Sequence, residues 1–213
     1  LTTCEELIRD SSILEKVKND IASLCQKLHL TLLGIAYTED ATPRLRDAVM
    51  SYGERLSVHI LAASLQDHSL EALPVESDKL GLHTNGRFGN GTVDYLKTQA
   101  ELPKTFAPYL QNNVIPVMTG FFGQNSNGDT VTFGRGGSDY SAAVMARVLD
   151  AGRLEVWKDV DGFQSISPEL SNRGHRLPGL SYDEAAELSY FGAKILHPRT
   201  VEPLLEKSIP IVI

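Results

Sequence analysis

The stretch TFGRGGSDY, residues 132–140, places three glycines, an arginine, a serine and an aspartate between a β-branched segment and an alanine-rich segment. The composition of residues 130–133 favours a strand, and residues 138–151 have the spacing of a helix. The polar stretch therefore lies where a strand is followed by a helix. In α/β proteins ligands bind at this position, so we predict a binding site here.

The chemistry of this stretch indicates an anionic ligand. Its glycines allow backbone N–H groups to converge, and a helix that begins at Ser138 turns the positive end of its dipole toward them. Arg135 adds a planar pair of donors suited to a carboxylate or a phosphate, and Asp139 supplies one negative charge. A purely structural interpretation is also open, in which Ser138 caps the helix and Asp139 lies in its first turn.

Apolar residues at helical spacing predict two long helices elsewhere in the chain. The first begins at a capping box formed by Thr3 and Glu6 and extends to about Leu28, and the second begins at Thr42-Pro43. Shorter apolar patterns predict helices near residues 138–151 and 181–191 and strands at residues 71–75, 114–119, 154–158 and 209–213.

Two local motifs add detail to this pattern. Ser181 and Glu184 form a second capping box, and NSNGD at 125–129 predicts a hairpin turn between strands at 117–122 and 130–133. Helices and strands alternate along the chain. This alternation predicts the α/β class with a largely parallel sheet.

The composition excludes some classes of partner. The chain has 213 residues, of which 42% are hydrophobic, and its formal net charge is −7. With a pI near 5.4 and no run of four basic residues, it lacks the field that nucleic acid or an anionic membrane requires. No apolar segment approaches the roughly 20 residues that span a bilayer. Cys4 and Cys25, predicted on the first helix, are expected to be free thiols in the reducing cytoplasm.

Several motifs occur in a fixed order from about residue 40 to the end of the chain. They are SYGERLS at 51–57, TNGRFG at 84–89, GFFG at 120–123, GRGGSDYSAA at 134–143, VWKDVDG at 156–162, EAAE at 184–187 and FGAKILHP at 191–198. This ordered set resembles the aspartate kinases of the amino-acid kinase family. An ordered set of this length is far more specific than any one of its motifs.

The resemblance implies a fold and a reaction. The fold is an amino-acid kinase-like three-layer sandwich, α/β, with a largely parallel sheet flanked by helices, occupying residues 1–213. The reaction is ATP-dependent phosphorylation of L-aspartate to 4-phospho-L-aspartate with Mg²⁺, which begins lysine, threonine and methionine biosynthesis. The resemblance also implies a cytoplasmic protein that is a homo-oligomer at full length.

The same resemblance implies that this chain is a partial catalytic domain, incomplete at its N-terminus. The family usually begins with a strand and a Lys-Phe-Gly-Gly loop that reaches the transferring phosphate, and it usually carries regulatory ACT domains after the last strand seen here. Neither is present in the sequence. We therefore expect the 213-residue chain by itself to have no kinase activity.

Site residues follow from the resemblance, position by position. The residues expected to bind the aspartate substrate are Glu54, Phe121, Arg135, Gly136, Gly137 and Ser138. The residues expected to bind the nucleotide are Lys158, Asp159, Gln164, Lys194 and Ile195. Glu54 is assigned to the ammonium group of aspartate. Asp139 and Lys194 are the expected catalytic residues, because Asp139 organises the reacting groups and Lys194 is placed near the phosphates.

Departures from the family pattern fall in the nucleotide loop. Gln164 stands where the family has a tyrosine, and Glu169 stands where it has an arginine that meets the ATP phosphates. We expect a neighbouring cation, Arg173 or Arg176, to take the place of that arginine. We also expect Trp157 to lie in the core, and the residues after Lys194 to end a loop before the last helix, with His197 in a structural role.

Two other functions remain open at this point. One is a different amino-acid kinase, acting on glutamate, N-acetylglutamate or a nucleoside monophosphate. The other is a module that binds an amino acid without turnover, a possibility supported by the divergent loop around Gln164 and Glu169. The context of Glu54 and the GRGGSDY segment favour aspartate as the substrate.

Overall fold

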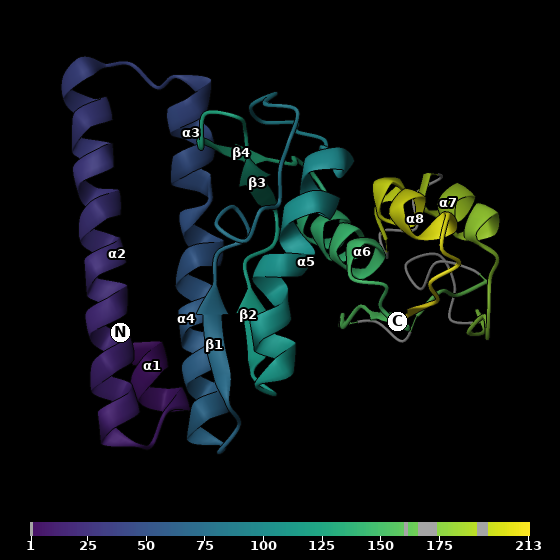
Figure 1. Cartoon of the computed structure of the whole chain (residues 1–213), viewed down its shortest axis with the longest axis horizontal. Helices are drawn as coiled ribbons and strands as arrows, with labels where there is room; N and C mark the ends of the chain where they lie inside the picture. The colour runs from purple at the N-terminus through teal and green to yellow at the C-terminus, as the bar shows by residue number, and fades with distance from the viewer. Residues whose placement is uncertain (1, 160–161, 166–173, 191–195) are drawn as a thin grey trace. The chain divides into compact units, whose positions relative to one another are not determined.

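The computed structural model of the chain describes residues 2–159, 162–165, 174–190 and 196–213. The chain forms two compact units, Leu1–Gly134 and Arg135–Ile213, which are described one at a time (Figure 1). Helices and strands occur in both units. The predicted α/β class is confirmed.

Unit 1 contains five helices and four strands among its described residues. The helices are α1 (Thr2–Leu7), α2 (Ser11–Thr38), α3 (Pro43–Met50), α4 (Tyr52–Asp67) and α5 (Tyr95–Gln111), and the strands are β1 (Ala72–Val75), β2 (Ile115–Met118), β3 (Phe122–Gln124) and β4 (Thr130–Thr132). Strands β1 and β2 are parallel, with Ala72 opposite Ile115 and Val75 opposite Met118. Strands β3 and β4 form an antiparallel pair.

The core of unit 1 lies on both faces of helix α4. One cluster of buried side chains joins α2 to α4 and includes Val17, Ile21 and Ala63. A second cluster joins α4 to the parallel strands and includes Val58 and Val117. Figure 1 shows the resulting order within this unit, with α4 between α2 and the parallel pair β1–β2.

The first predicted helix is two helices in the structure. Helix α1 ends at Leu7, and Asp10 begins α2 because its carboxylate accepts hydrogen bonds from the N–H groups of Ser12 and Ile13. The prediction of one continuous helix from Thr3 was therefore wrong. An aspartate N-cap satisfies N–H groups that a helix start leaves unpaired, so Asp10 was the local signal for the break. Cys4 lies on α1, and both it and Cys25 are free.

The second predicted helix starts where expected. The Thr42 hydroxyl accepts a hydrogen bond from the N–H of Leu45, and Pro43 occupies the first turn of α3. The helix is then interrupted at Ser51, which ends α3 and begins α4. None of the described helices is both long enough and apolar enough to cross a membrane.

The predicted hairpin at residues 125–129 is confirmed. The Asn125 side-chain oxygen accepts hydrogen bonds from the N–H groups of Asn127 and Asp129, which closes the turn between β3 and β4. The strand that enters the turn is shorter and later than predicted, because residues 115–118 form the separate strand β2 that pairs with β1.

Unit 2 is built around a parallel pair of short strands. Its described elements are α6 (Gly137–Val148), β5 (Leu154–Glu155), α7 (Tyr182–Tyr190), α8 (Pro198–Leu205) and β6 (Ile211–Val212). Strands β5 and β6 pair in parallel, and a core that includes Ala143, Ala146 and Leu204 joins helices α6 and α8. The second capping box is confirmed, because the Ser181 N–H donates to Glu184 Oε2 at 2.8 Å and the Glu184 N–H donates to Ser181 Oγ at 3.2 Å.

Candidate active site

The GRGGSDY segment forms the start of helix α6 in unit 2. The N-cap is Gly136, in the left-handed conformation at φ 67°, and it makes no side-chain capping hydrogen bond. The alternative interpretation, in which Ser138 caps the helix, does not hold, because the helix already begins at Gly137. Arg135 and Ser138 are exposed. A helix N-terminus with an exposed arginine and serine beside it presents donors to an anion.

A histidine packs directly on this turn. A Cβ atom at Gly136 would lie 2.4 Å from both Cβ and Cγ of His197, so only glycine fits between the turn and the ring. His197 is the N-cap of α8, where its Nδ1 accepts a hydrogen bond from the Arg199 N–H at 3.3 Å. The expected structural role of His197 is confirmed, and it includes support for the start of α6.

The environment of His197 predicts an acid-sensitive contribution to stability. Burial, followed by the charges of Arg199 and Arg135, lowers the pKa of His197 below its ordinary value of 6.5, and Asp139 opposes this shift. Because the folded chain binds the proton less readily than the unfolded chain, the neutral ring favours the folded state above pH 6.5, and this contribution is lost as the pH falls through the lowered pKa.

We therefore expect the melting temperature of the chain to fall less between pH 7.5 and pH 5.5 in His197→Asn than in the parent. Asparagine retains a capping side chain but does not titrate in this range. Thermal unfolding followed by circular dichroism at both pH values measures the difference. Equal losses in the two proteins would contradict the role given to this ring.

The predicted residues Asp139 and Lys158 meet in unit 2. Lys158 Nζ donates to Asp139 Oδ2 at 2.9 Å, and the two side chains are 25% and 23% exposed, respectively. The Arg199 guanidinium lies 4.4 Å from the centre of the Tyr140 ring, one residue after Asp139. Arg199 was not among the predicted site residues, because it lies on α8, after the end of the FGAKILHP motif.

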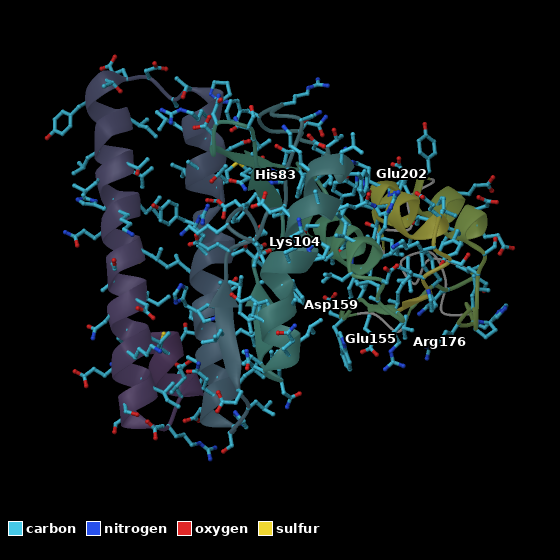
Figure 2. The ribbon with its side chains drawn as sticks, in the orientation of Figure 1. His83, Lys104, Glu155, Asp159, Arg176 and Glu202 are labelled. Carbon is cyan, nitrogen blue, oxygen red and sulfur yellow. The ribbon has the colours of Figure 1, made fainter. Side chains whose placement is uncertain are left out.

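The nucleotide residues that the structure describes lie near the ends of strands β5 and β6. The Leu177 N–H donates to the Phe163 carbonyl oxygen at 2.8 Å, and this short antiparallel contact sets Arg176 opposite Gln164. Arg176 and Lys158 line one cleft of about 320 Å³. The exposed Asp159 and Arg176 both project from this unit (Figure 2).

Trp157 also lines this cleft, contrary to expectation. Its side chain is 89% exposed, so the prediction that it belongs to the core was wrong. Trp157 lies beyond the two residues of β5 that pair with β6, Leu154 and Glu155. Lys194, Ile195, Glu169 and Arg173 fall outside the described residues. Among the residues that are described, no group of three acidic, histidine or cysteine side chains is arranged to hold a metal ion.

The other predicted substrate residues, Glu54 and Phe121, belong to unit 1. Glu54 lies half-buried in the first turn of α4. Phe121 has φ 72°, a left-handed conformation that is unusual for a bulky residue, and its carbonyl oxygen accepts the Phe133 N–H at 2.8 Å. Such backbone outliers cluster at functional sites, so this geometry agrees with a role for Phe121.

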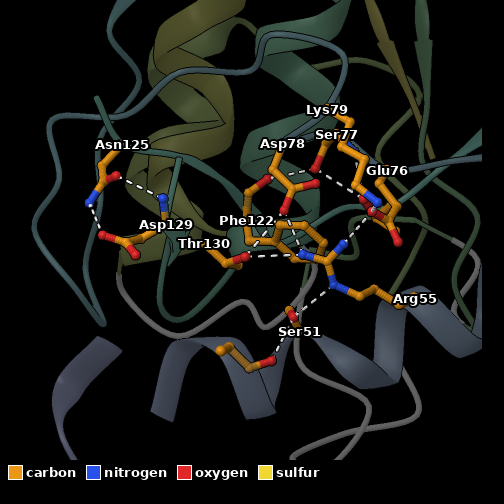
Figure 3. Close-up of polar contacts among 12 residues, drawn as sticks. Ser51, Arg55, Glu76, Ser77, Asp78, Lys79, Phe122, Asn125, Asp129 and Thr130 are labelled. Carbon is orange, nitrogen blue, oxygen red and sulfur yellow. Dashed lines mark hydrogen bonds and ion pairs between the residues drawn. The ribbon is translucent and has the colours of Figure 1, made fainter. Parts of the chain in front are cut away.

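Arg55, next to Glu54, lies at the centre of a polar cluster with Glu76, Asp78 and Thr130 (Figure 3). Its guanidinium donates to Asp78 at 2.5 Å and to Thr130 at 3.0 Å, and it pairs with Glu76 at 2.7 Å. The same group lies 4.6 Å from the centre of the Phe122 ring. Burial acts to raise the pKa of Glu76, but the hydrogen bonds and charges of Lys79 and Arg55 lower it. The carboxylates that pair with Arg55 are thus Glu76 and Asp78.

Comparison with known proteins identifies the family. The chain matches the Amino acid kinase family over residues 5–213 and belongs to it. It is 35% identical to Aspartokinase 1, chloroplastic, of Arabidopsis thaliana over 99% of this chain and 36% of that protein. It is 32% identical to Lysine-sensitive aspartokinase 3 of Escherichia coli over 95% of this chain and 45% of that protein. The chain thus spans less than half the length of these relatives.

Solved structures agree with the family assignment. The crystal structure of E. coli aspartokinase III in complex with aspartate and ADP, in the R-state, matches with a TM-score of 0.85 and 31% identity, over 98% of this chain and 45% of that one. The structure of the same enzyme in complex with lysine and aspartate, in the T-state, matches with a TM-score of 0.82. These matches confirm the amino-acid kinase fold.

Proposed function

We propose that this chain is part of an enzyme that transfers the γ-phosphoryl group of ATP to the side-chain carboxylate of L-aspartate, giving 4-phospho-L-aspartate. The observation that carries the proposal is the exposed Arg135 beside the glycine-capped start of α6. It is supported by the likeness to an aspartokinase solved with aspartate and ADP. The residues 1–213 then form part of an amino-acid kinase catalytic domain.

The substrate's charges match the predicted residues. Aspartate carries two carboxylates and one ammonium group, so its site needs several donors and a separate anion. The Arg135 guanidinium, the N–H groups of Gly136 and Gly137 and the Ser138 hydroxyl supply donors for carboxylates. Glu54 supplies the anion for the ammonium group, and the strained Phe121 lies beside the substrate.

The reaction requires positioning and positive charge more than covalent chemistry. An oxygen of the aspartate side chain attacks the γ-phosphorus, the bond to the bridging oxygen breaks, and ADP leaves with that electron pair. Lys158 and Lys194 offer ammonium groups to the phosphate oxygens. Asp139, which already holds Lys158 Nζ at 2.9 Å, orients the reacting groups.

Mg²⁺ fits this proposal as an ion that arrives with the nucleotide. Such ions are held mostly by phosphate oxygens and water, with one or two protein carboxylates. Asp139 and Asp159 are the two carboxylates that could contact the ion. The bound ion would reduce the negative charge of the phosphates. A cytoplasmic location and a homo-oligomeric full-length protein complete the proposal.

Two measurements test this function. Isothermal titration of the 213-residue chain with L-aspartate, L-glutamate and Mg-ATP measures the binding of each ligand. Turnover is measured in an extended form, in which this chain is joined to the segments that flank the matching region of E. coli Lysine-sensitive aspartokinase 3. We expect binding that prefers aspartate, and aspartate-dependent ADP release by the extended form only. Binding of glutamate as tight as that of aspartate would overturn the substrate assignment, and binding of aspartate without any turnover in the extended form would favour a binding module.

Arg176 is proposed to provide the cation that Glu169 does not. Arg176→Ala in the extended form is expected to raise the KM for Mg-ATP about tenfold, because a charge-assisted hydrogen bond is lost, while the KM for aspartate stays nearly constant. Lys207→Ala, which removes an exposed cation paired with Asp150, is the matched control. If Arg176→Ala binds Mg-ATP as tightly as the parent, another residue fills this role.

A further inference from the structure

Asp47 is a buried carboxylate to which the proposed reaction gives no role. It lies on α3 and is 2% exposed. Its Oδ2 accepts hydrogen bonds from the N–H groups of Gly89 and Thr132, each at 2.8 Å, and its Oδ1 accepts one from Thr132 Oγ1 at 3.0 Å. Within the described part of the chain, no lysine, arginine or histidine forms an ion pair with it.

A buried carboxylate without a cation needs explanation. Its desolvation is costly, and hydrogen bonds from N–H and O–H donors are what make it tolerable. Here the three donors come from two segments far from α3 in sequence, at separations of 42 residues for Gly89 and 85 for Thr132. Asp47 therefore joins three parts of unit 1: helix α3, the loop that contains Gly89, and the end of β4.

The loop in question is the TNGRFG motif at 84–89, which the proposed reaction leaves unassigned. Its shape is fixed internally by Asn85, whose side-chain oxygen accepts the N–H groups of Arg87 at 3.1 Å and Thr92 at 3.2 Å. It is also tied to β4, because the Gly91 N–H donates to the Thr132 carbonyl oxygen at 2.8 Å. The loop is thus hydrogen-bonded both within itself and to the end of β4.

Close packing at Gly134 shows that this contact extends to the edge of the GRGGSDY segment. Gly134 has φ 75°, and a Cβ atom there would lie 3.0 Å from the Gly89 carbonyl oxygen. On the other side, the Phe133 N–H holds the carbonyl oxygen of the strained Phe121. Phe121, which is proposed to lie beside the substrate, therefore adjoins the part of unit 1 that Asp47 fixes.

We propose that Asp47 is a positioning residue for the amino-acid substrate. Its carboxylate holds the 84–89 loop against the end of β4, so that Phe121, whose carbonyl oxygen accepts the Phe133 N–H just after β4, is kept in a binding conformation before aspartate arrives. A site that is already ordered loses less conformational entropy when it binds. This inference rests on the proposed function for the identity of the ligand, but not for the ordering of the segment.

The first test compares two KM values in the extended form. Asp47→Asn is nearly the same size but places an NH₂ group or a single carbonyl oxygen among donors, so we expect the KM for L-aspartate to rise about tenfold and the KM for Mg-ATP to change less than about twofold. Thr132→Val, which removes only the hydroxyl bond, is expected to have a smaller effect in the same direction. Thr132→Val also tests the positioning role if Asp47→Asn fails to fold.

The matched control is Asp10→Ala. Asp10 caps α2 through the N–H groups of Ser12 and Ile13, so its loss destabilises unit 1 without touching the loop or β4. It is expected to lower the melting temperature and to leave both KM values unchanged. If Asp10→Ala raises the KM for aspartate as much as Asp47→Asn does, the effect is general destabilisation, and the positioning role is overturned.

The second test does not depend on activity. Hydrogen–deuterium exchange is measured for the unaltered 213-residue chain and for its variants Asp47→Asn and Asp10→Ala. Faster exchange at residues 84–92 and 121–134 in Asp47→Asn alone is the expected result, and unchanged exchange at 121–134 overturns the inference. A parent protein without aspartate turnover would refute the proposed function, and the exchange data would still decide whether Asp47 orders this segment.

Discussion

Replacing Arg135 with lysine is expected to raise the KM for L-aspartate by roughly tenfold to a hundredfold in the extended form, and to leave the KM for Mg-ATP nearly constant. Lysine keeps the positive charge but loses the planar pair of N–H groups that can meet both oxygens of a carboxylate. Arg135 is exposed at the start of α6, so the exchange should not disturb the core. Initial rates at varied aspartate and varied ATP measure both constants.

The control for this prediction is Arg44→Lys. Arg44 is also an exposed arginine, and it pairs with Asp129 at 3.4 Å in unit 1. It is expected to behave like the parent. An unchanged aspartate KM in Arg135→Lys would show that this arginine does not bind the substrate carboxylate, and a rise in the ATP constant of equal size would place it on the nucleotide instead.

Replacing Gly136 with alanine is expected to destabilise unit 2 severely and to abolish aspartate binding. The left-handed conformation at φ 67° costs an alanine about 1–2 kcal/mol, and overpacking costs a further ~1–3 kcal/mol. The added Cβ would lie 2.4 Å from both Cβ and Cγ of His197, which are too close to the backbone to swing aside. For a unit of this size we expect the melting temperature to fall by roughly 10 °C or more.

Two further variants identify the cause of that loss. Gly152→Ala is the matched control, because nothing lies within 4 Å of the added atom and the residue is exposed. The double variant Gly136→Ala, His197→Gly removes the clash but not the backbone strain, so part of the stability should return. If Gly136→Ala melts at the same temperature as Gly152→Ala, the ring does not pack on this turn as the structure indicates.

Local chemistry explains which elements of the fold were predictable. Thr42-Pro43, the Ser181 and Glu184 pair and the 125–129 turn are each settled by hydrogen bonds within a few residues, and all three were predicted correctly. Helix α5 was not predicted, because Pro103 and Pro108 within it usually break a helix. Packing against the rest of unit 1 offsets the cost of these prolines, since Leu102 and Thr98 are both fully buried.

Part of the candidate site could likewise be predicted from the sequence, and part could not. The chemical types at Arg135, Asp139 and Lys158 are visible in the sequence, and the 2.9 Å pair between the last two agrees with a shared role. Contacts between residues that are distant in sequence cannot be predicted in this way. In unit 1 Asp47 accepts a hydrogen bond from Gly89, and in unit 2 His197 packs on Gly136. Both glycines are distant in sequence from their partners, so no local pattern predicts these contacts. The exposure of Trp157 was missed because a large apolar residue beside a predicted strand is usually buried, and it is 89% exposed here.

The order of strands β5 and β6 has a consequence for folding kinetics. They are parallel, and helices α7 and α8 lie between them in the chain, so their hydrogen bonds form only after a long loop has closed. We expect the β5–β6 pairing to form late, on the native side of the folding barrier. A nucleotide held at the ends of these strands therefore slows the unfolding of unit 2 more than it speeds its folding.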